Sequence, residues 1–122
     1  MTTAPTTFPR HARLLSKGDF QAVFQDNNCR STDPQLTLLA RHNGLEFARL
    51  GLAVGKKVDK RAVVRNRIKR QVRESFRHHQ QALTGLDIVV VGREAASRVN
   101  NPDLRQSLQA HWRRVAERCA KA

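Results

Sequence analysis

Long apolar stretches are missing from this sequence of 122 residues, and its first ten residues contain no apolar signal-peptide core. The longest compact apolar segment, Ile88–Val91, has the length of a strand, whereas a membrane-spanning helix needs roughly 20 apolar residues. These two shortages argue against secretion and against a membrane anchor. We therefore expect a cytoplasmic protein.

Cysteine is scarce as well, because Cys29 and Cys119 are the only two. They lack metal-ligand spacing and could form at most one bridge. In a chain without an export signal we expect both to be reduced thiols. No set of Cys and His residues has the spacing of a zinc site.

Residues suited to protein-based catalysis are also missing. None of the ten acidic residues forms a convincing pair for acid–base chemistry or two-metal catalysis. His78 and His79 are adjacent, so on a helix they point about 100° apart, which favours two solvated side chains over a metal or proton-shuttle site. The remaining histidines have no evident partners: His11, His42 and His111. We expect no catalytic residue in this chain and no metal bound by it.

The shortage of negative charge is the most informative one, because 10 Asp and Glu oppose 23 Lys and Arg and leave a net charge of +13. Such an excess destabilises a compact state by self-repulsion unless a polyanion or salt screens it. Nucleic acid is the first candidate for a partner, and an anionic membrane surface is the second. The length fits one domain, which we place at residues 13–122, behind a flexible arm at residues 1–12.

The first part of that domain predicts a helix followed by a strand. Ser16 and Asp19 have nearly the spacing and chemistry of a capping box, so we expect a helix to begin at Ser16. Residues 26–34 are polar and typical of a turn. Residues 36–41 are typical of a strand, and Asn43-Gly44 then suggests a hairpin-like loop.

Residues 49–55 alternate between two kinds of side chain, which predicts a strand with two unlike faces. One face is apolar and consists of Leu50, Leu52 and Val54. The other face is nearly bare and consists of Gly51, Ala53 and Gly55. We expect another group to approach the backbone on the bare face.

The second half predicts two helices around a further strand. Asp59 is a plausible cap for a long helix over residues 60–83, which Gly85 would end. Residues 87–92 are typical of a central strand, and Asn101-Pro102 predicts the start of a terminal helix that packs through Trp112. The order is helix, strands, helix, strand, helix. We predict an α+β fold, a small single-domain sandwich with helices packed on one mixed sheet.

Positive charge is concentrated in one segment, where only Asp59 and Glu74 oppose ten basic residues: Lys56, Lys57, Lys60, Arg61, Arg65, Arg67, Lys69, Arg70, Arg73 and Arg77. A charge run is usually a solvated face, but a helix that is merely soluble mixes both signs. The imbalance favours a surface that neutralises several phosphates at once. Arg65 falls close to the apolar stripe of this helix, so part of its role is expected to be structural.

This segment closely resembles the signature of the bacterial ribonuclease P protein, which combines an upstream Lys56-Lys57 with residues 61–77 around Arg65-Asn66-Arg67. The resemblance covers most of residues 8–118. It includes Phe8-Pro9-Arg10 at the opening, residues 49–57 before the signature and residues 87–91 after it.

The resemblance implies a left-handed crossover around the basic helix, whereas general handedness rules favour a right-handed one. It also implies the protein subunit of a ribonucleoprotein endoribonuclease, in which the RNA holds the catalytic centre and uses Mg²⁺. The implied partners are that catalytic RNA and precursor tRNA, whose 5′ leader is removed to give the mature tRNA end. No membrane and no obligate protein partner are implied.

The resemblance further implies two sets of site residues. The catalytic RNA would contact Arg65, Asn66, Arg67, Lys69, Arg70 and Arg73, extended by Lys56, Lys57, Lys60 and Arg61. The leader would lie in a cleft lined by Phe20, Phe24, Leu38 and Leu39. Taken alone, Phe20 and Phe24 favour ordinary core positions, and it is the resemblance that favours contact with the leader. The chain has no tyrosine, and a leucine at 38 or 39 stands where some family members carry an aromatic residue, so we expect less stacking in this cleft.

Three other functions fit parts of the sequence. A ribosomal protein or general RNA chaperone explains the charge and the lack of catalytic groups, but it does not explain the long signature. A DNA-binding protein would favour a helix-turn-helix pair, which the strands before the basic helix argue against. A stand-alone nuclease would need a carboxylate cluster that the sequence does not offer.

Overall fold

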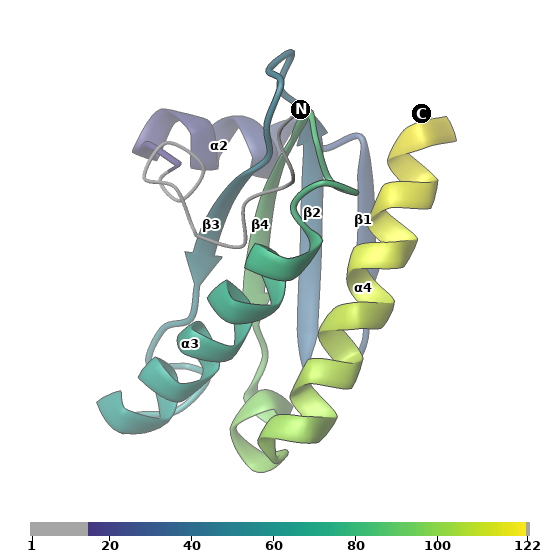
Figure 1. Cartoon of the computed structure of the whole chain (residues 1–122). Coiled ribbons are helices and arrows are strands. Elements are labelled where there is room, and N and C mark those ends of the chain that lie inside the picture. Colours follow the sequence, from purple (N-terminus) through teal and green to yellow (C-terminus); the bar gives the residue numbers. More distant parts are fainter. Residues whose placement is uncertain (1–14, 122) are drawn as a thin grey trace.

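A computed structural model describes residues 15–121, so the arm expected at residues 1–12 lies outside the described residues. Figure 1 shows the helices and strands, coloured by their order along the chain. They are α2 (Lys17–Gln25), β1 (Cys29–Thr32), β2 (Leu36–His42), β3 (Arg49–Ala53), α3 (Ala62–His79), β4 (Leu86–Gly92), the short 3₁₀ helix η1 (Glu94–Arg98) and α4 (Asn101–Lys121). The predicted α+β fold is confirmed.

One mixed sheet organises these elements in the order β1-β2-β4-β3. β2 pairs with β1 and β4 in antiparallel fashion, and β3 pairs with β4 in parallel. The apolar strand β4 lies in the interior of the sheet, as its run of buried residues predicts. The hairpin expected at Asn43-Gly44 is wrong, because β4 lies between β2 and β3.

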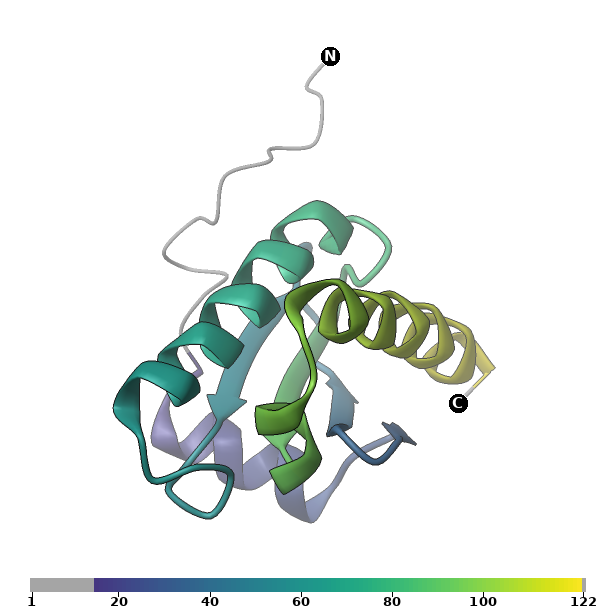
Figure 2. The same cartoon turned by 90° about the horizontal axis from the view of Figure 1, so that it is seen from below.

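Helices cover both faces of this sheet. Figure 2 shows α3 and α4 on one side and α2 on the other. The crossover from β3 through α3 to β4 is left-handed, because in Figure 1 α3 lies in front of the sheet, both strands run downward and β4 lies to the right of β3. This confirms the handedness that the family resemblance implies and departs from the general rule.

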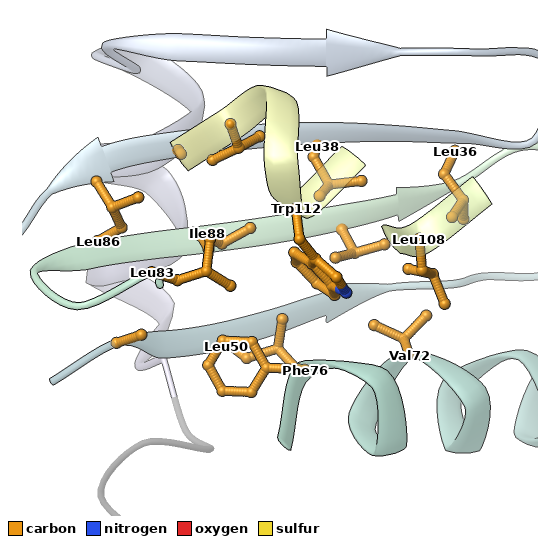
Figure 3. Close-up of a cluster of buried hydrophobic side chains, with 14 of the residues drawn as sticks. Leu36, Leu38, Leu50, Val72, Phe76, Leu83, Leu86, Ile88, Leu108 and Trp112 are labelled. Carbon is orange, nitrogen blue, oxygen red and sulfur yellow. The ribbon is translucent and has the colours of Figure 1, made fainter. Parts of the chain in front are cut away.

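The alternation of side chains along the strands divides the core into two clusters. Leu38, Leu50 and Ile88 point toward α3 and α4, where they meet Phe76 and Trp112 (Figure 3). Leu39 and Val89 point the other way and form a smaller cluster with Leu15 and Val23 beneath α2. The indole Nε1 of Trp112 donates to Ser75 Oγ at 2.8 Å, which confirms its packing role.

Helix boundaries follow local capping chemistry. The capping box predicted at Ser16 and Asp19 is present. α3 begins at Ala62 rather than Lys60, and Asp59 does not cap it, because that carboxylate accepts the backbone N–H of Arg61 instead. The cap of α4 is Asn100, one residue earlier than expected, since its Oδ1 accepts the N–H of Asp103. No helix among residues 15–121 has the length and apolar character that crossing a bilayer requires.

Strand β1 and the cysteines differ from the expectation. Residues 26–34 are not all turn, because Cys29–Thr32 pair with β2 as an edge strand. Cys29 and Cys119 are joined by a disulfide with a Cα–Cα separation of 5.5 Å, so the prediction of reduced thiols is wrong. The bond ties β1 to the last turn of α4.

A buried polar network also lies between β1 and α4, although the sequence suggests no partner for its central histidine. His111 is fully buried, and its Nδ1 shares a 2.7 Å hydrogen bond with Ser31 Oγ. Its Nε2 lies 3.0 Å from Asp33 Oδ2 without forming a regular hydrogen bond. Burial lowers the pKa of His111 below 6.5, and the attraction of Asp33 offsets this only in part.

Burial also opposes ionisation of Asp33, but hydrogen bonds from Ser107, Leu36 and Gln35 outweigh it and lower the pKa of Asp33 below 3.8. His111 is therefore neutral and Asp33 ionised at neutral pH. The unfolded chain takes up a proton on this histidine near pH 6.5, whereas the folded chain resists it. The stability contributed here is complete above pH 6.5 and is lost as the pH falls below that value.

We predict that His111→Asn reduces the pH dependence of unfolding between pH 7.5 and 5.5, although the variant is less stable at both values. The difference in slope is at most about 1.4 kcal/mol per pH unit, the value for one proton. Urea unfolding of both proteins at each pH measures it. Parallel pH profiles for the two proteins would contradict the assignment.

Candidate nucleic-acid interface

The outer face of α3 carries the predicted contact residues because the opposite face is anchored in the core. Ile68, Val72 and Phe76 are fully buried against the sheet. Asn66, Arg70 and Arg73 are exposed, while Arg65, Arg67 and Lys69 are half-buried on the flanks of the helix. The helix therefore presents a cationic surface along much of its length, as the sequence predicts.

Arg65 is partly structural, as its position near the apolar stripe suggests. Its Nη1 donates to the backbone carbonyls of Asp59 at 3.0 Å and Lys60 at 2.8 Å. Arg61 pairs with the Asp59 carboxylate, and its hydrogen bonds lower the pKa of Asp59 from 3.8 to about 2. Together these contacts hold the loop between β3 and α3 in one shape and keep Asp59 ionised.

Arg67 also has a structural contact, which links α3 to α4. Its Nη1 donates to Asn101 Oδ1 at 2.8 Å, and Arg105 of α4 donates to Gln71 Oε1 at 3.2 Å. By contrast, Arg70 and Arg73 have no hydrogen bond or ion pair within the part of the chain that the structure describes. These two arginines are therefore the most available for an external anion.

The remaining predicted contacts, Lys56, Lys57, Lys60 and Arg61, are exposed in the loop that precedes α3. The structure also places an apolar side chain on this face, since Val63 is 73% exposed in the first turn of α3. Sequence analysis did not single out Val63, although a valine among cations at helical spacing is a readable signal. Isolated apolar residues are common on protein surfaces.

The predicted leader cleft lies on the α2 side of the sheet. Phe20 packs over Gly51, where an added Cβ would lie 2.6 Å from Phe20 Cζ, and this confirms the close approach expected at the bare strand face. Phe24 is 48% exposed, and Leu39 is buried in the cluster beneath α2. Leu38 is wrong as a cleft residue, because it points to the opposite face and is fully buried beneath α4 and α3.

Arg49 fixes α2 on the sheet, and sequence analysis missed it. Its guanidinium donates twice to Asp87, with both distances 2.7 Å, and its Nη1 lies 3.2 Å from Asp19 Oδ2 of α2. Asn43 Nδ2 donates to Asp87 Oδ1 at 2.9 Å. The sequence carries no signal for this pair, because only the parallel pairing of β3 with β4 places Arg49 beside Asp87.

We predict that Arg49→Gln lowers the free energy of unfolding by about 2 to 3 kcal/mol, because it leaves the buried Asp87 carboxylate without its charged partner. Amide exchange in α2 should accelerate more than in α4. The matched control is Arg41→Gln, whose ion pair with Asp26 spans 3.8 Å between exposed side chains. That change should cost less than about 0.5 kcal/mol. Equal losses in the two variants would refute the anchoring role of Arg49.

Known proteins resemble this chain in sequence and in fold. The family model of ribonuclease P matches residues 8–116. The ribonuclease P protein component of a Marinomonas species is 49% identical over 114 residues, which cover 93% of this chain and 86% of that protein. The corresponding protein of Pseudoalteromonas atlantica is 48% identical over 116 residues, with 95% and 96% covered.

Solved structures of related proteins have the same fold as this chain. The RNase P protein of Staphylococcus aureus superposes with a TM-score of 0.77 at 29% identity and covers 84% of this chain and 93% of its own. The RNase P protein of Thermotoga maritima gives a TM-score of 0.70 at 33% identity, with 83% and 96% covered. A match of this extent in sequence and fold confirms the resemblance read from the basic segment, and the chain belongs to the ribonuclease P protein family.

Proposed function

We propose that this chain binds the catalytic RNA of ribonuclease P through α3 and the 5′ leader of precursor tRNA through the α2 side of the sheet, and so promotes endonucleolytic removal of the leader. One observation carries this proposal. α3, which carries the cationic face, and α2, which carries Phe20 and Phe24, lie on opposite sides of one sheet (Figure 2), so one small domain can contact two RNA strands at once.

The α3 surface is suited to RNA because its charge is rigidly mounted. Arg70 and Arg73 project from a helix whose inner face is packed against the core. On binding, only these two side chains must become ordered, so the loss of conformational entropy is small. Each phosphate that such a cation neutralises releases a condensed counterion. In this proposal the hydrolytic centre and its Mg²⁺ belong to the RNA, and the protein reduces repulsion between phosphates.

The α2 side is suited to a single strand of any sequence. The exposed ring of Phe24 offers a stacking surface, and stacking tolerates every base. Phe20 is held against Gly51 and supports the floor of the site together with Leu39. Phe24 is the one exposed phenylalanine or tryptophan ring among residues 15–121, and the chain has no tyrosine, so apolar contact takes a larger share of the binding than stacking does.

A ribosomal protein or general RNA chaperone is not favoured, because the family match spans residues 8–116 rather than the basic segment alone. The cytoplasmic location stays a prediction, and so does the single domain over residues 13–122.

Reconstitution tests the proposal directly. We expect efficient cleavage of precursor tRNA at its 5′ junction at low Mg²⁺ only when this protein and a bacterial ribonuclease P RNA are combined. If the protein binds RNA but adds nothing to cleavage, a chaperone role replaces the proposal. Cleavage by the protein alone would reveal an active site in the chain.

The two surfaces should separate by mutation. Arg70→Gln with Arg73→Gln should weaken binding of the catalytic RNA and reduce its log–log salt slope by about 2, one for each phosphate contact. Phe24→Ala should leave that binding unchanged but lower the preference for precursor over mature tRNA by about tenfold, the loss of one stacked base. All three side chains are exposed, so the fold should survive.

The charge control for the first surface is Arg113→Gln, an exposed position on α4 rather than on α3. It should change neither the salt slope of catalytic RNA binding nor the preference for precursor tRNA. The same defect in the α3 and α2 variants would refute the division into two surfaces.

A further inference from the structure

A cationic cleft lies at the edge of the sheet where the parallel strands β3 and β4 both end. The chain leaves β3 into the loop before α3 and leaves β4 into η1, so two segments far apart in sequence lie at one edge (Figures 1 and 2). Together they line a cleft of about 510 Å³. Its cations are Lys56, Lys57, Lys60 and Arg61 from the loop and Arg98 from η1.

From this cleft we infer that the phosphate backbone of the catalytic RNA binds between the β3–α3 loop and η1, and that Arg98 is a contact residue supplied from outside α3. The inference rests on the proposed function and extends it to a second segment of the chain. Arg98 lies outside the basic segment that the sequence singles out, because it follows Arg77 by 21 positions.

The charge of the cleft favours an anion. Its five cationic side chains outnumber its two carboxylates, Asp59 and Glu94. Each carboxylate already has a partner within the cleft, since Asp59 lies 3.0 Å from Arg61 and Glu94 lies 2.7 Å from Arg98. The side chains of the three lysines have no hydrogen bond or ion pair to any described residue. An excess of three positive charges therefore faces the solvent.

Both walls of the cleft are fixed before any ligand arrives. Val58 anchors the loop in the core and packs against Gly92 at the end of β4, where an added Cβ would lie 3.1 Å from Val58 Cγ2. Arg65 holds two carbonyls of the same loop. On the other wall, Ala96 is fully buried and anchors η1. A preformed site loses less conformational entropy on binding.

The ion pair between Glu94 and Arg98 is weak enough for a phosphate to replace Glu94 as the partner of Arg98. Both side chains are mostly exposed, at 70% and 64%, so their attraction is weak in water. A phosphate can replace the carboxylate as the partner of the guanidinium, and arginine matches its oxygens with two parallel N–H donors.

The position of the cleft favours the catalytic RNA over the leader as its occupant. The loop leads directly into the first turn of α3, so the cleft continues the cationic surface that ends in Arg70 and Arg73. α2 lies toward the opposite end of the sheet and on its other face (Figures 1 and 2). The cleft is open rather than enclosed, which suits a polymer backbone and leaves a small anion largely hydrated.

Three single variants of the full chain test the inference by binding to a bacterial ribonuclease P RNA over a series of potassium chloride concentrations. Arg98→Gln should weaken binding by about tenfold and reduce the salt slope by about 1. Glu94→Gln should strengthen binding, because it removes negative charge and frees Arg98. The matched control Arg113→Gln removes another exposed arginine, from α4, and should change the affinity by less than about twofold.

The outcomes separate this inference from the proposed function. If Arg98→Gln behaves like Arg113→Gln while the Arg70 and Arg73 variant still binds weakly, the cleft is overturned and the α3 surface stands. If Arg98→Gln impairs only the binding of precursor tRNA to the preassembled holoenzyme, the assignment to the catalytic RNA is overturned. If the unaltered protein does not bind the catalytic RNA, both proposals fail.

Lys57→Gln tests the opposite wall of the cleft, which the loop before α3 forms. This variant should also bind the catalytic RNA more weakly than the unaltered protein does.

Discussion

Parallel pairing of β3 with β4 is the constraint on which the rest of this molecule depends. Parallel neighbours cannot be joined by a tight turn, so the chain must return across a face of the sheet, and α3 makes that return. The return places the inner face of α3 against Leu50 and Ile88 and its outer face toward solvent. Packing against the sheet thus fixes the position of α3 and of the arginines on its outer face.

The same pairing joins the two surfaces that we propose to bind RNA. The amino ends of β3 and β4 bring Arg49 beside Asp87, and this pair anchors α2 through Asp19. The carboxyl ends bring the lysine loop beside η1. One strand pair therefore positions the aromatic site at one end and the cationic cleft at the other. Arg65 and Arg67 each combine a structural contact with a predicted RNA contact. Arg65 donates to a backbone carbonyl, and Arg67 donates to the side-chain oxygen of Asn101.

Sequence patterns predicted the element types well but not the order of the strands. The alternation of residues 49–55 correctly predicted which side chains lie on each face of β3. In β2, neighbouring residues likewise point to opposite faces, so Leu39 faces α2 whereas the misassigned Leu38 does not. Without knowing which strand neighbours which, however, the pairing of Arg49 with Asp87 could not be predicted. Strand order is a property of the whole chain, and local periodicity carries no information about it.

Strand β1 escaped prediction for a different physical reason. Its buried positions are Cys29 and Ser31, and Ser31 is satisfied by hydrogen bonds to His111 and Arg114 rather than by apolar neighbours. A strand buried through polar contacts has no hydrophobic pattern to read. The candidate contact residues on α3 were predictable because charge density is visible in sequence, whereas Arg98 became visible only when the fold brought η1 beside the lysine loop.

The terminal helix has a consequence for how the molecule is made. α4 supplies Trp112 and Leu108 to the larger core and joins Cys119 to Cys29 across 90 residues of sequence. Contacts of such long range slow folding, because the chain must close a large loop before they form. A ribosome delivers α4 after all four strands, so the α4 half of the sheet stays uncovered until this helix has been synthesised. During that interval the nascent chain combines an exposed apolar sheet face with the full charge of the basic helix, until α4 docks and covers that face.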